Sequence, residues 1–243
     1  MRASDITFDG VTRRKGAGGR ETVLNRLSLT IAPGACVGLM GKSGSGKTTL
    51  LRLLNRLEDP DEGRVNYGGR DIRQLLPTDL RRRVALVTQK PVMFSGRVRD
   101  NIVAADTLAG RAEGDAERAR RVLALAQLTD DFLDRDASAL SVGQQARVQL
   151  ARALYTNPEV LLLDEATASL DPKIAGIVLD ALARVVRDEG RILVHVAHEP
   201  DKMRRCDRLL VLAEGRIAQD GPPASILDNP TGAVADVLGE ASK

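Results

Sequence analysis

A glycine-rich segment that ends in a lysine and two threonines, GKSGSGKTT at residues 41–49, has the residue types needed to bind phosphate. It follows an apolar run at residues 36–40 and precedes a leucine-rich run at residues 50–57. Glycines allow the backbone to curl with its N–H groups turned inward, and a helix that begins there adds the positive end of its dipole. The order strand, loop, helix is the context that a phosphate-binding loop requires.

The positions of this loop have expected functions in holding a nucleoside triphosphate. The lysine at its end can reach the β- and γ-phosphates, and the hydroxyl that follows can bind Mg²⁺. The alternative is a glycine-rich turn that binds nothing, which the flanking strand and helix disfavour. The residues expected to bind the phosphates are Gly41, Lys42, Ser43, Gly44, Ser45, Gly46, Lys47, Thr48 and Thr49.

A second segment, VLLLDE at residues 160–165, is an apolar strand that ends in two acids. A buried strand that brings a carboxylate to a phosphate loop supplies a second anchor for Mg²⁺, often through water, and we expect Asp164 to do this. Glu165 is placed to polarise an attacking water as a general base. Acidic pairs at strand ends are often only solvated, but together with the loop this pair predicts nucleotide hydrolysis.

The composition is that of an ordinary globular protein. Hydrophobic residues make up 43% and charged residues 28% of the 243 residues, which is enough for one large or two small domains. Aromatic residues make up only 2%, which disfavours a stacking platform for single-stranded nucleic acid. The net charge of +3 gives no argument for nucleic acid and is compatible with a nucleotide ligand or an anionic membrane surface.

The two cysteines, Cys36 and Cys206, form neither a disulfide framework nor a metal pattern, which suits a reducing compartment. Cys36 falls in the apolar run before the loop, and we expect it to be a small core residue. The N-terminus carries no signal peptide, and no apolar run approaches the ~20 residues that cross a bilayer. If the protein serves a membrane, we expect it to do so as a soluble subunit.

The apolar periodicity predicts an α/β domain with one helical insertion. Short runs that would be buried on both faces, as in a parallel sheet, lie at 36–40, 160–163 and 192–197. Other strands are expected at 5–8, 23–31, 64–67, 84–88, 208–213 and 216–219, with a basic, glycine-rich hairpin loop at 11–19. Helices are expected at 50–57, 145–155, 172–186 and 233–238, and residues 98–140 should form a helical region without strands.

Further motifs indicate a family. The segment LSVGQ at residues 140–144 opens a helix, and alone it would be only a helix cap by Ser141. It lies just upstream of the acidic strand, however, and the chain resembles the ATP-binding subunit of an ABC (ATP-binding cassette) transporter from end to end. The signature of that family is LSGGQ. Gln89 falls at its Q-loop, residues 169–171 (SLD) at its D-loop and His198 at its switch histidine.

The resemblance implies a fold and a domain organisation. The fold would be an α/β P-loop NTPase (RecA-like) core with an antiparallel β subdomain and an inserted α-helical subdomain. Residues 1–243 would form one ATPase domain, with 1–97 and 157–243 as the core and its β subdomain, and about 98–156 as the helical signature subdomain. The implied ligands are ATP and Mg²⁺.

The resemblance also implies site residues. The catalytic residues would be Glu165, His198, Lys47 and Gln89, and Mg²⁺ would lie near Thr48, Gln89 and Asp164. In this family two ATP-binding subunits sandwich two ATP molecules head to tail. Ser141, Gly143 and Gln144 would therefore close on the ATP of the partner, and Asp171 would communicate between the two sites.

The implied partners are a transmembrane permease subunit and a second ATP-binding subunit, either a copy of this chain or a paralogue, with no nucleic acid. The ATPase would power solute movement through the permease, whose cytoplasmic helix is expected in the groove after Gln89, near residues 91–94. The implied location is cytoplasmic and peripheral, on the inner face of the cell membrane. Residues 54–57 resemble importers and residues 91–102 resemble exporters, so the direction of transport stays open.

The chain departs from the family pattern in two places. The family stacks adenine on an aromatic residue after the first strand, whereas here no aromatic follows Phe8 and residues 13–15 are basic. A guanidinium of Arg13 or Arg14 could stack on the base instead. Val142 replaces the first glycine of the signature pair, which is tolerated if its backbone is helical or extended and strained if φ is positive.

Other function classes share parts of this pattern. A soluble ABC ATPase of DNA repair or translation would carry two cassettes or a long coiled-coil insertion, and a regulatory ATP-binding module would lack Glu165 or His198. A P-loop kinase would have no use for LSVGQ. His195 lies inside a predicted strand, and we expect it to be a core residue.

Overall fold

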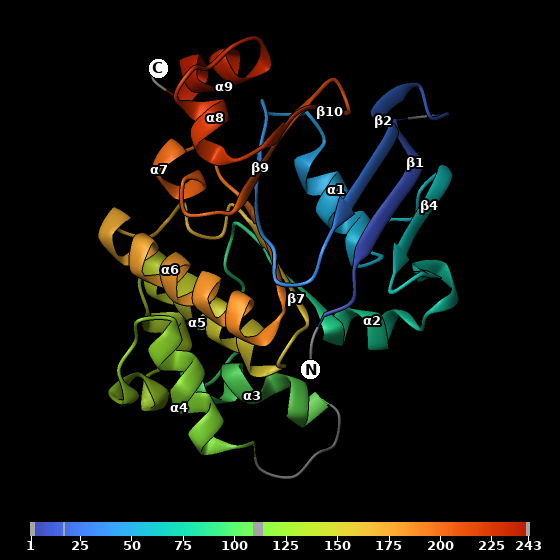
Figure 1. The fold of residues 1–243 in the computed structure, drawn as a ribbon. Coiled ribbons are helices and arrows are strands. Elements are labelled where there is room, and N and C mark those ends of the chain that lie inside the picture. The colour runs from blue at the N-terminus through green and yellow to red at the C-terminus, as the bar shows by residue number, and fades with distance from the viewer. Residues whose placement is uncertain (1–2, 17, 109–113, 242–243) are drawn as a thin grey trace.

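The computed structural model describes residues 3–16, 18–108 and 114–241, and two β-sheets form its framework (Figure 1). The antiparallel sheet has the order β2 (Glu21–Ile31), β1 (Ile6–Lys15), β4 (Glu62–Tyr67) and β5 (Arg70–Asp71). The second sheet has the order β10 (Arg216–Gly221), β9 (Arg208–Ala213), β3 (Cys36–Met40), β8 (Ile192–Val196), β7 (Val160–Asp164) and β6 (Val84–Val87). It is parallel from β9 to β6, and β10 pairs antiparallel with β9.

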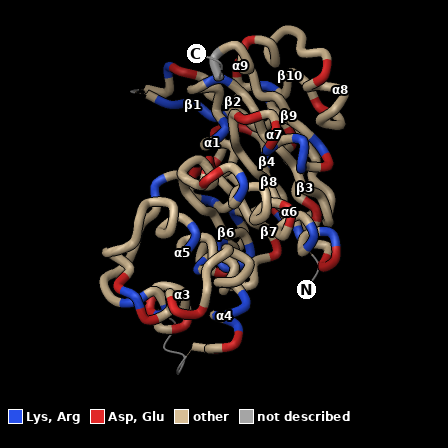
Figure 2. The backbone as a smooth tube through the Cα atoms, turned by 90° about the vertical axis from the view of Figure 1, so that its left-hand side faces the viewer, with Lys and Arg blue, Asp and Glu red and all other residues tan. Residues whose placement is uncertain are grey.

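The helices gather around the parallel sheet. They are α1 (Lys47–Leu54), α2 (Pro77–Arg83), α3 (Val98–Leu108), α4 (Ala116–Leu125), α5 (Val142–Tyr155), α6 (Pro172–Glu189), α7 (Pro200–Met203), α8 (Pro223–Leu227) and α9 (Ala233–Ala241). Figures 1 and 2 show α3, α4 and α5 together at one side of the molecule, away from β1 and β2. Among the residues described, no helix combines the length and the apolar character that a membrane span needs.

The central strands of the parallel sheet confirm the predicted runs at 36–40, 160–163 and 192–197 to within one residue. Every residue of β3 and β8 is buried, and so is β7 up to its last residue. Helices such as α5 and α6 cover one face of the sheet, and α1 with the antiparallel sheet covers the other. Cys36 is buried in β3, as predicted. Since parallel strands end at the same edge, the segments that follow β3, β7 and β8 start side by side.

The predicted hairpin loop at 11–19 is wrong in its first part, because β1 continues to Lys15. β1 pairs with β2 along one edge and with β4 along the other, and Lys15 lies opposite Glu21. The β4 ladder ends at Thr12, so residues 13–15 pair with β2 alone, and the N–H of Arg14 donates instead to the carboxylate of Asp61 at 2.6 Å. A register shift around Gly10, whose φ is 57°, accommodates the change in pairing. Residue 17 of the predicted loop lies outside the described residues.

Helix boundaries differ from the predictions for local reasons. α1 begins at Lys47 rather than Leu50, because the left-handed Gly46 is its N-cap and accepts a hydrogen bond from the N–H of Leu50 at 2.8 Å. α1 also ends at Leu54, three residues early. α5 begins at residue 142 rather than 145, because its first turn carries a capping box. The short helices α2, α7 and α8 were not predicted, since none is long enough to show a period.

The expected helical region without strands holds in the described part of residues 98–140, and residues 109–113 of it lie outside the described residues. One isolated β-bridge joins Arg97, just before that region, to Asp136. In this region α3 and α4 pack against α5, and apolar side chains such as Ile102 and Leu123 are fully buried between them.

A buried carboxylate joins the two sheets at the end opposite the glycine loop. Glu159, just before β7, is 4% exposed and accepts hydrogen bonds from Arg83 at 2.8 and 3.1 Å and from the hydroxyl of Tyr67. Burial acts to raise the pKa of Glu159, but the bonds from Arg83 and Tyr67 lower it below its ordinary value of 4.5. Burial also raises the pKa of Tyr67, to about 12. Glu159 is therefore ionised at neutral pH and links β4 to α2.

Glu159→Gln should lower the free energy of unfolding by about 1–3 kcal/mol at pH 7, because a buried charged partner of Arg83 is lost. A depressed pKa in the folded state means that this stability is present above pH 4.5 and is lost as the pH falls through the folded value. The difference between variant and wild type should therefore shrink in acid. Urea unfolding at pH 7 and at pH 4 measures it.

A matched control is Asp131→Asn, which removes an ion pair between two largely exposed side chains, Asp131 and Arg135. That variant should unfold at nearly the same urea concentration as wild type, because solvent screens an exposed ion pair. If Glu159→Gln were as stable as wild type at pH 7, the proposed link between the sheets would be wrong.

Candidate active site

The glycine loop lies between β3 and α1, and backbone conformation explains its glycines. Gly44 and Gly46 have φ values of 80° and 106°, which side-chain-bearing residues rarely adopt. A Cβ at Gly46 would also lie 2.9 Å from Leu24. Lys47 is 6% exposed, and its ammonium donates to the carbonyls of Gly41 at 2.6 Å and Lys42 at 2.9 Å. The lysine thus curls back over the loop, at the predicted phosphate site.

A cavity of about 320 Å³ opens beside this loop. The loop and the start of α1 contribute Ser43, Gly44, Gly46, Lys47, Thr48 and Thr49 to its lining. The hairpin of β1 and β2 contributes Lys15, Glu21 and Val23, and the segment after β7 contributes Glu165. The cavity therefore extends from the predicted phosphate site to the hairpin, with the predicted base at its side.

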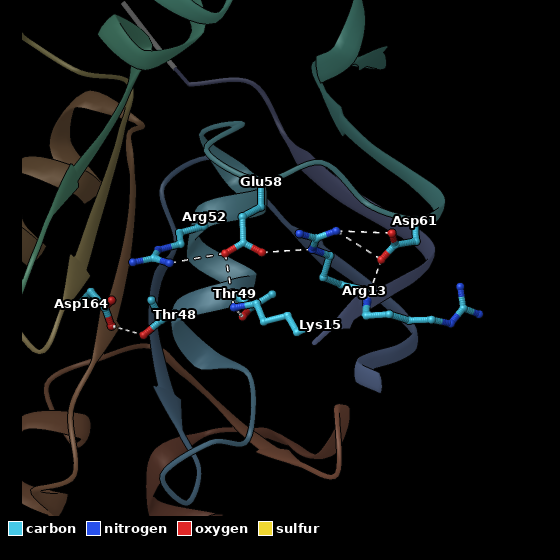
Figure 3. Close-up of polar contacts among 9 residues, drawn as sticks. Arg13, Lys15, Thr48, Thr49, Arg52, Glu58, Asp61 and Asp164 are labelled. Atoms are coloured by element: carbon cyan, nitrogen blue, oxygen red, sulfur yellow. Dashed lines mark hydrogen bonds and ion pairs between the residues drawn. The ribbon is translucent and has the colours of Figure 1, made fainter. Parts of the chain in front are cut away.

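Oxygen ligands suited to Mg²⁺ lie at the start of α1. The hydroxyl of Thr48 donates to Oδ1 of Asp164 at 3.2 Å, so both groups lie close together (Figure 3). Burial, with the nearby charge of Glu165, raises the pKa of Asp164 against the lowering effect of the bond from Thr48. A hydroxyl and a carboxylate in contact are hard oxygen donors, so this pair fits the divalent ion predicted for it.

Glu165 is the centre of a second cluster. Its Oε2 accepts a hydrogen bond from Nε2 of Gln89 at 2.9 Å, and its Oε1 lies 3.0 Å from Nε2 of His198. Two predicted catalytic residues, Gln89 and His198, which lie 76 and 33 positions from Glu165 in the sequence, thus meet at its carboxylate. The backbone of Glu165 is left-handed, with φ 53°, a conformation that costs energy in a residue other than glycine. Gln89 thus contacts Glu165, the neighbour of Asp164, and its predicted place near Mg²⁺ stays a prediction.

The signature residues lie at the N-terminus of α5, apart from the cavity. Ser141 accepts from the N–H of Gln144 at 3.3 Å, while the Gln144 side chain accepts from the N–H of Ser141 at 3.0 Å. None of Ser141, Gly143 and Gln144 lines the loop cavity in the described chain. Gly143 packs closely on the turn after β7, since a Cβ there would lie 2.9 Å from the carbonyl oxygen of Ser169.

Val142 and Asp171 both serve local helix geometry. Val142 is the first residue of α5 and takes its helical backbone, so the valine causes no backbone strain, and its side chain is 60% exposed. Asp171 is the N-cap of α6, where its carboxylate accepts from the N–H groups of Lys173 and Ile174. The predicted communication through Asp171 remains a prediction.

His195 is a core residue, as predicted. It is fully buried in β8, and its Nε2 lies 3.2 Å from the hydroxyl of Thr167. Burial, and then the charge of Lys202, lower the pKa of His195 to about 3, against a smaller raising effect of Glu199. Lys202 also donates to the carbonyl of Thr167 at 3.2 Å. This polar contact between β8, α7 and the turn after β7 was missed, because an apolar run around a histidine carries no signal for it.

The structure gives no support to stacking by Arg13 or Arg14. Arg13 donates to Glu58 at 3.0 Å and contacts Asp61 at 3.3 Å, while Arg14 pairs with Glu62. Neither arginine lines the cavity, whereas Lys15, the third residue of the basic run, does. Side-chain alternation along β1 separates Arg14 from its two neighbours, and the acids around Arg13 hold it away from the loop.

A family model described as "ABC transporter" matches residues 24–168. The chain is 41% identical over 222 residues to protein STAR1 of Oryza sativa subsp. japonica, covering 91% of this chain and 64% of that protein. It is 40% identical over 233 residues to the methionine import ATP-binding protein MetN of Xanthomonas euvesicatoria pv. vesicatoria (strain 85-10), covering 93% and 69%. The chain therefore spans about two thirds of the length of these relatives.

A solved structure of a bacterial Atm1-family ABC exporter with ATP bound is similar to this chain with a TM-score of 0.86 and 30% sequence identity. The similarity covers 99% of this chain and 42% of that chain. The fold described above, with its antiparallel and parallel sheets, is thus the one expected from the motifs.

The buried neutral His195 predicts a pH-dependent loss of stability. The unfolded chain binds a proton below about pH 6.5 and the folded chain does not, so stability falls as the pH decreases from 6.5 toward 3. By pH 5 this amounts to about 2 kcal/mol. His195→Gln should remove that part of the slope, measured by urea unfolding at pH 7, 6 and 5.

The other histidine of the chain provides the control. His198→Gln removes the imidazole that is 39% exposed, so a change of slope specific to His195→Gln assigns the effect to the buried ring. An unchanged slope in His195→Gln would show that the buried imidazole is protonated in the folded chain.

Proposed function

This chain belongs to the ABC transporter family, and on that premise we propose that it is the subunit that binds and hydrolyses ATP to power solute movement through a separate transmembrane subunit. ATP bound with Mg²⁺ is the standard ligand of this family. The observation that carries the proposal is Glu165, whose carboxylate lines the phosphate-loop cavity between Gln89 and His198.

In this proposal the glycine loop and the dipole of α1 hold the triphosphate, and Lys47 adds positive charge at the β- and γ-phosphates. Thr48 and Asp164 would hold Mg²⁺, with Gln89 beside them. When bound, the ion neutralises charge that develops on the phosphate oxygens during transfer. The contact between Thr48 and Asp164 supports this assignment, because it brings two oxygen donors together before any ligand binds.

Glu165 is the general base for the attacking water. Its two oxygens face Gln89 and His198, so the carboxylate has a defined direction at the edge of the cavity. A carboxylate held this way can accept the proton of a water as the water attacks the γ-phosphate. We assign to His198 contact with the γ-phosphate and orientation of that water, since its Nε2 lies on the same carboxylate.

A second ATP-binding subunit, a copy of this chain or a paralogue, would complete the site. Ser141, Gly143 and Gln144 lie outside the cavity of their own chain, which leaves them for the ATP of a partner. Val142 is an exposed apolar side chain at the N-terminus of α5, which supports the use of this surface in a subunit interface. We propose that Asp171, which begins α6 just after the turn at Ser169, senses closure of that interface.

The transmembrane partner would dock beside the Q-loop. A cavity of about 370 Å³ lies there, with exposed Leu57 and Val92 at its lining. Gln149 binds both sides of the Q-loop, accepting from the N–H of Val92 at 2.8 Å and donating to the carbonyl of Thr88 at 3.1 Å. A partner helix that displaces the lining of this groove would therefore also shift the segment 88–92, which contains Gln89. The chain would lie in the cytoplasm on the inner face of the membrane, as one ATPase domain with a helical subdomain at about 98–156.

Glu165→Gln should lower Mg²⁺-dependent ATP hydrolysis by about 10²–10⁴-fold, the contribution of a positioned general base, while ATP still binds. The same variant should accumulate as an ATP-bound dimer, because product formation no longer opens the interface. Phosphate release and mass in solution, measured with and without ATP, check both statements.

Lys173→Met, a change at an exposed residue of α6, serves as the control and should hydrolyse ATP like wild type. Hydrolysis by Glu165→Gln at the wild-type rate would remove Glu165 as the base. A wild-type chain that binds no ATP would refute the proposed function itself.

A further inference from the structure

A cluster of charged side chains connects the β-hairpin to the phosphate loop (Figure 3). At its centre is Glu58, a residue just after the end of α1. Its side chain is 13% exposed. Its carboxylate accepts from Arg13 at 3.0 Å and lies 3.3 Å from the ammonium of Lys15 and 3.4 Å from Arg52. Three cations thus contact one carboxylate beside the cavity, and one of them, Arg13, is shared with Asp61.

Lys15 is the member of this cluster that reaches the cavity. Its ammonium donates to the hydroxyl of Thr49 at 2.8 Å, in the first turn of α1, and its side chain is 36% exposed. Thr49 follows directly on Thr48, and both line the cavity. A second ammonium besides that of Lys47 therefore lies on the wall of the phosphate site, and it comes from a strand 34 positions away from Thr49.

The rest of the hairpin end offers little to a nucleotide base. The chain has five aromatic residues, all in its described part, and none lines the cavity. Three of them are buried elsewhere, namely Phe8, Tyr67 and Tyr155. The other two lie under arginines of the helical region, Phe94 under Arg152 and Phe132 under Arg135. A base at the hairpin end would meet Val23 and charged groups, with no ring to stack on.

We propose that Lys15 is an additional nucleotide-binding residue that contacts the phosphate next to the ribose, at Thr49, and that the chain takes its affinity from the triphosphate more than from the base. The substrate class is then nucleoside 5′-triphosphates, with ATP and GTP bound about equally. This inference rests on the proposed function, because it concerns the same site. The phosphate position follows from the cavity, since Lys15 and Thr49 lie between the glycine loop and the hairpin.

Glu58 acts on Lys15 as a positioning residue. Burial acts to raise the pKa of Glu58, but its bond to Arg13 and the charge of Lys15 lower it below the ordinary value, so Glu58 is an anion at neutral pH. An anion there fixes the ammonium against α1 without contact to the nucleotide itself. Arg13, which binds Glu58 from the other side, limits how strongly Glu58 competes with phosphate for Lys15.

The test compares Lys15→Met, which keeps the aliphatic stem and removes the charge, with Lys15→Arg, which restores a charge. Loss of one charge-assisted contact at a partly exposed site should weaken binding about ten-fold. The loss should be the same for ATP, GTP and inorganic tripolyphosphate, because the contact does not involve the base. Calorimetric Kd values in the Glu165→Gln background, and KM and kcat for ATP and GTP in the wild-type background, measure it.

Lys15→Arg should bind within a few-fold of wild type, and kcat should change little in either variant. A second neutral variant, Lys15→Gln, must give the same result as Lys15→Met, and melting temperatures show whether each variant is folded. The matched control is Arg73→Met, which removes another ion-paired cation near the antiparallel sheet and should bind all three ligands like wild type.

Three results would overturn the inference, and they are distinguishable. Unchanged Kd values in folded Lys15→Met and Lys15→Gln would make Lys15 a purely structural tie between β1 and α1. A loss for ATP and GTP with unchanged tripolyphosphate binding would mean that Lys15 contacts the base or ribose. A wild-type chain that binds none of the three ligands would refute the proposed function together with this inference.

Discussion

Parallel pairing of β3, β8 and β7 is the constraint on which the candidate site depends. Leu39 and Asp164 both lie opposite Val196, so the three strands end at one level. The glycine loop, Glu165 and His198 follow these ends directly, and they come together because they share that edge. Burial on both faces holds the register, since a shift by one residue would turn every side chain of a strand to the opposite face.

The turn after β7 connects the parts of the site that lie far apart in the sequence. Its first residue, Glu165, has a left-handed backbone, and such strain persists only where the surroundings impose it. Two contacts impose it: Thr167 is bound by His195 and Lys202, and the carbonyl of Ser169 lies so close to Gly143 that a Cβ there would come within 2.9 Å of it. The turn at residues 165–171 therefore contains the proposed base, borders the N-terminus of α5 and ends at the N-cap of α6.

Ion pairs, rather than aromatic side chains, connect the parts of this molecule. With aromatics at 2%, the molecule builds its core from aliphatic residues and joins its parts through ion pairs such as those of Glu58 and Glu159. Both carboxylates are largely buried, and cationic partners keep the pKa of each below its ordinary value. Such links are directional, so they fix how β1 and β4 meet the helices as well as adding stability.

Local chemistry was enough to predict much of this protein. The loop at 41–48, the acidic strand end at 164–165 and the buried strands follow from glycine conformations and apolar runs, which depend on neighbouring residues alone. A capping box likewise explains why α5 begins where it does, although we predicted its start three residues late.

Packing decided the rest. The basic run at 13–15 has the composition of a loop, yet it is a strand because β2 pairs with it along its whole length, while the β4 ladder ends at Thr12. The sequence suggested Arg13 or Arg14 for the nucleotide, but strand alternation and the acids at 58–62 left Lys15 at the cavity. Partners separated by tens of residues are set by the fold as a whole, so no local pattern in the sequence could identify them.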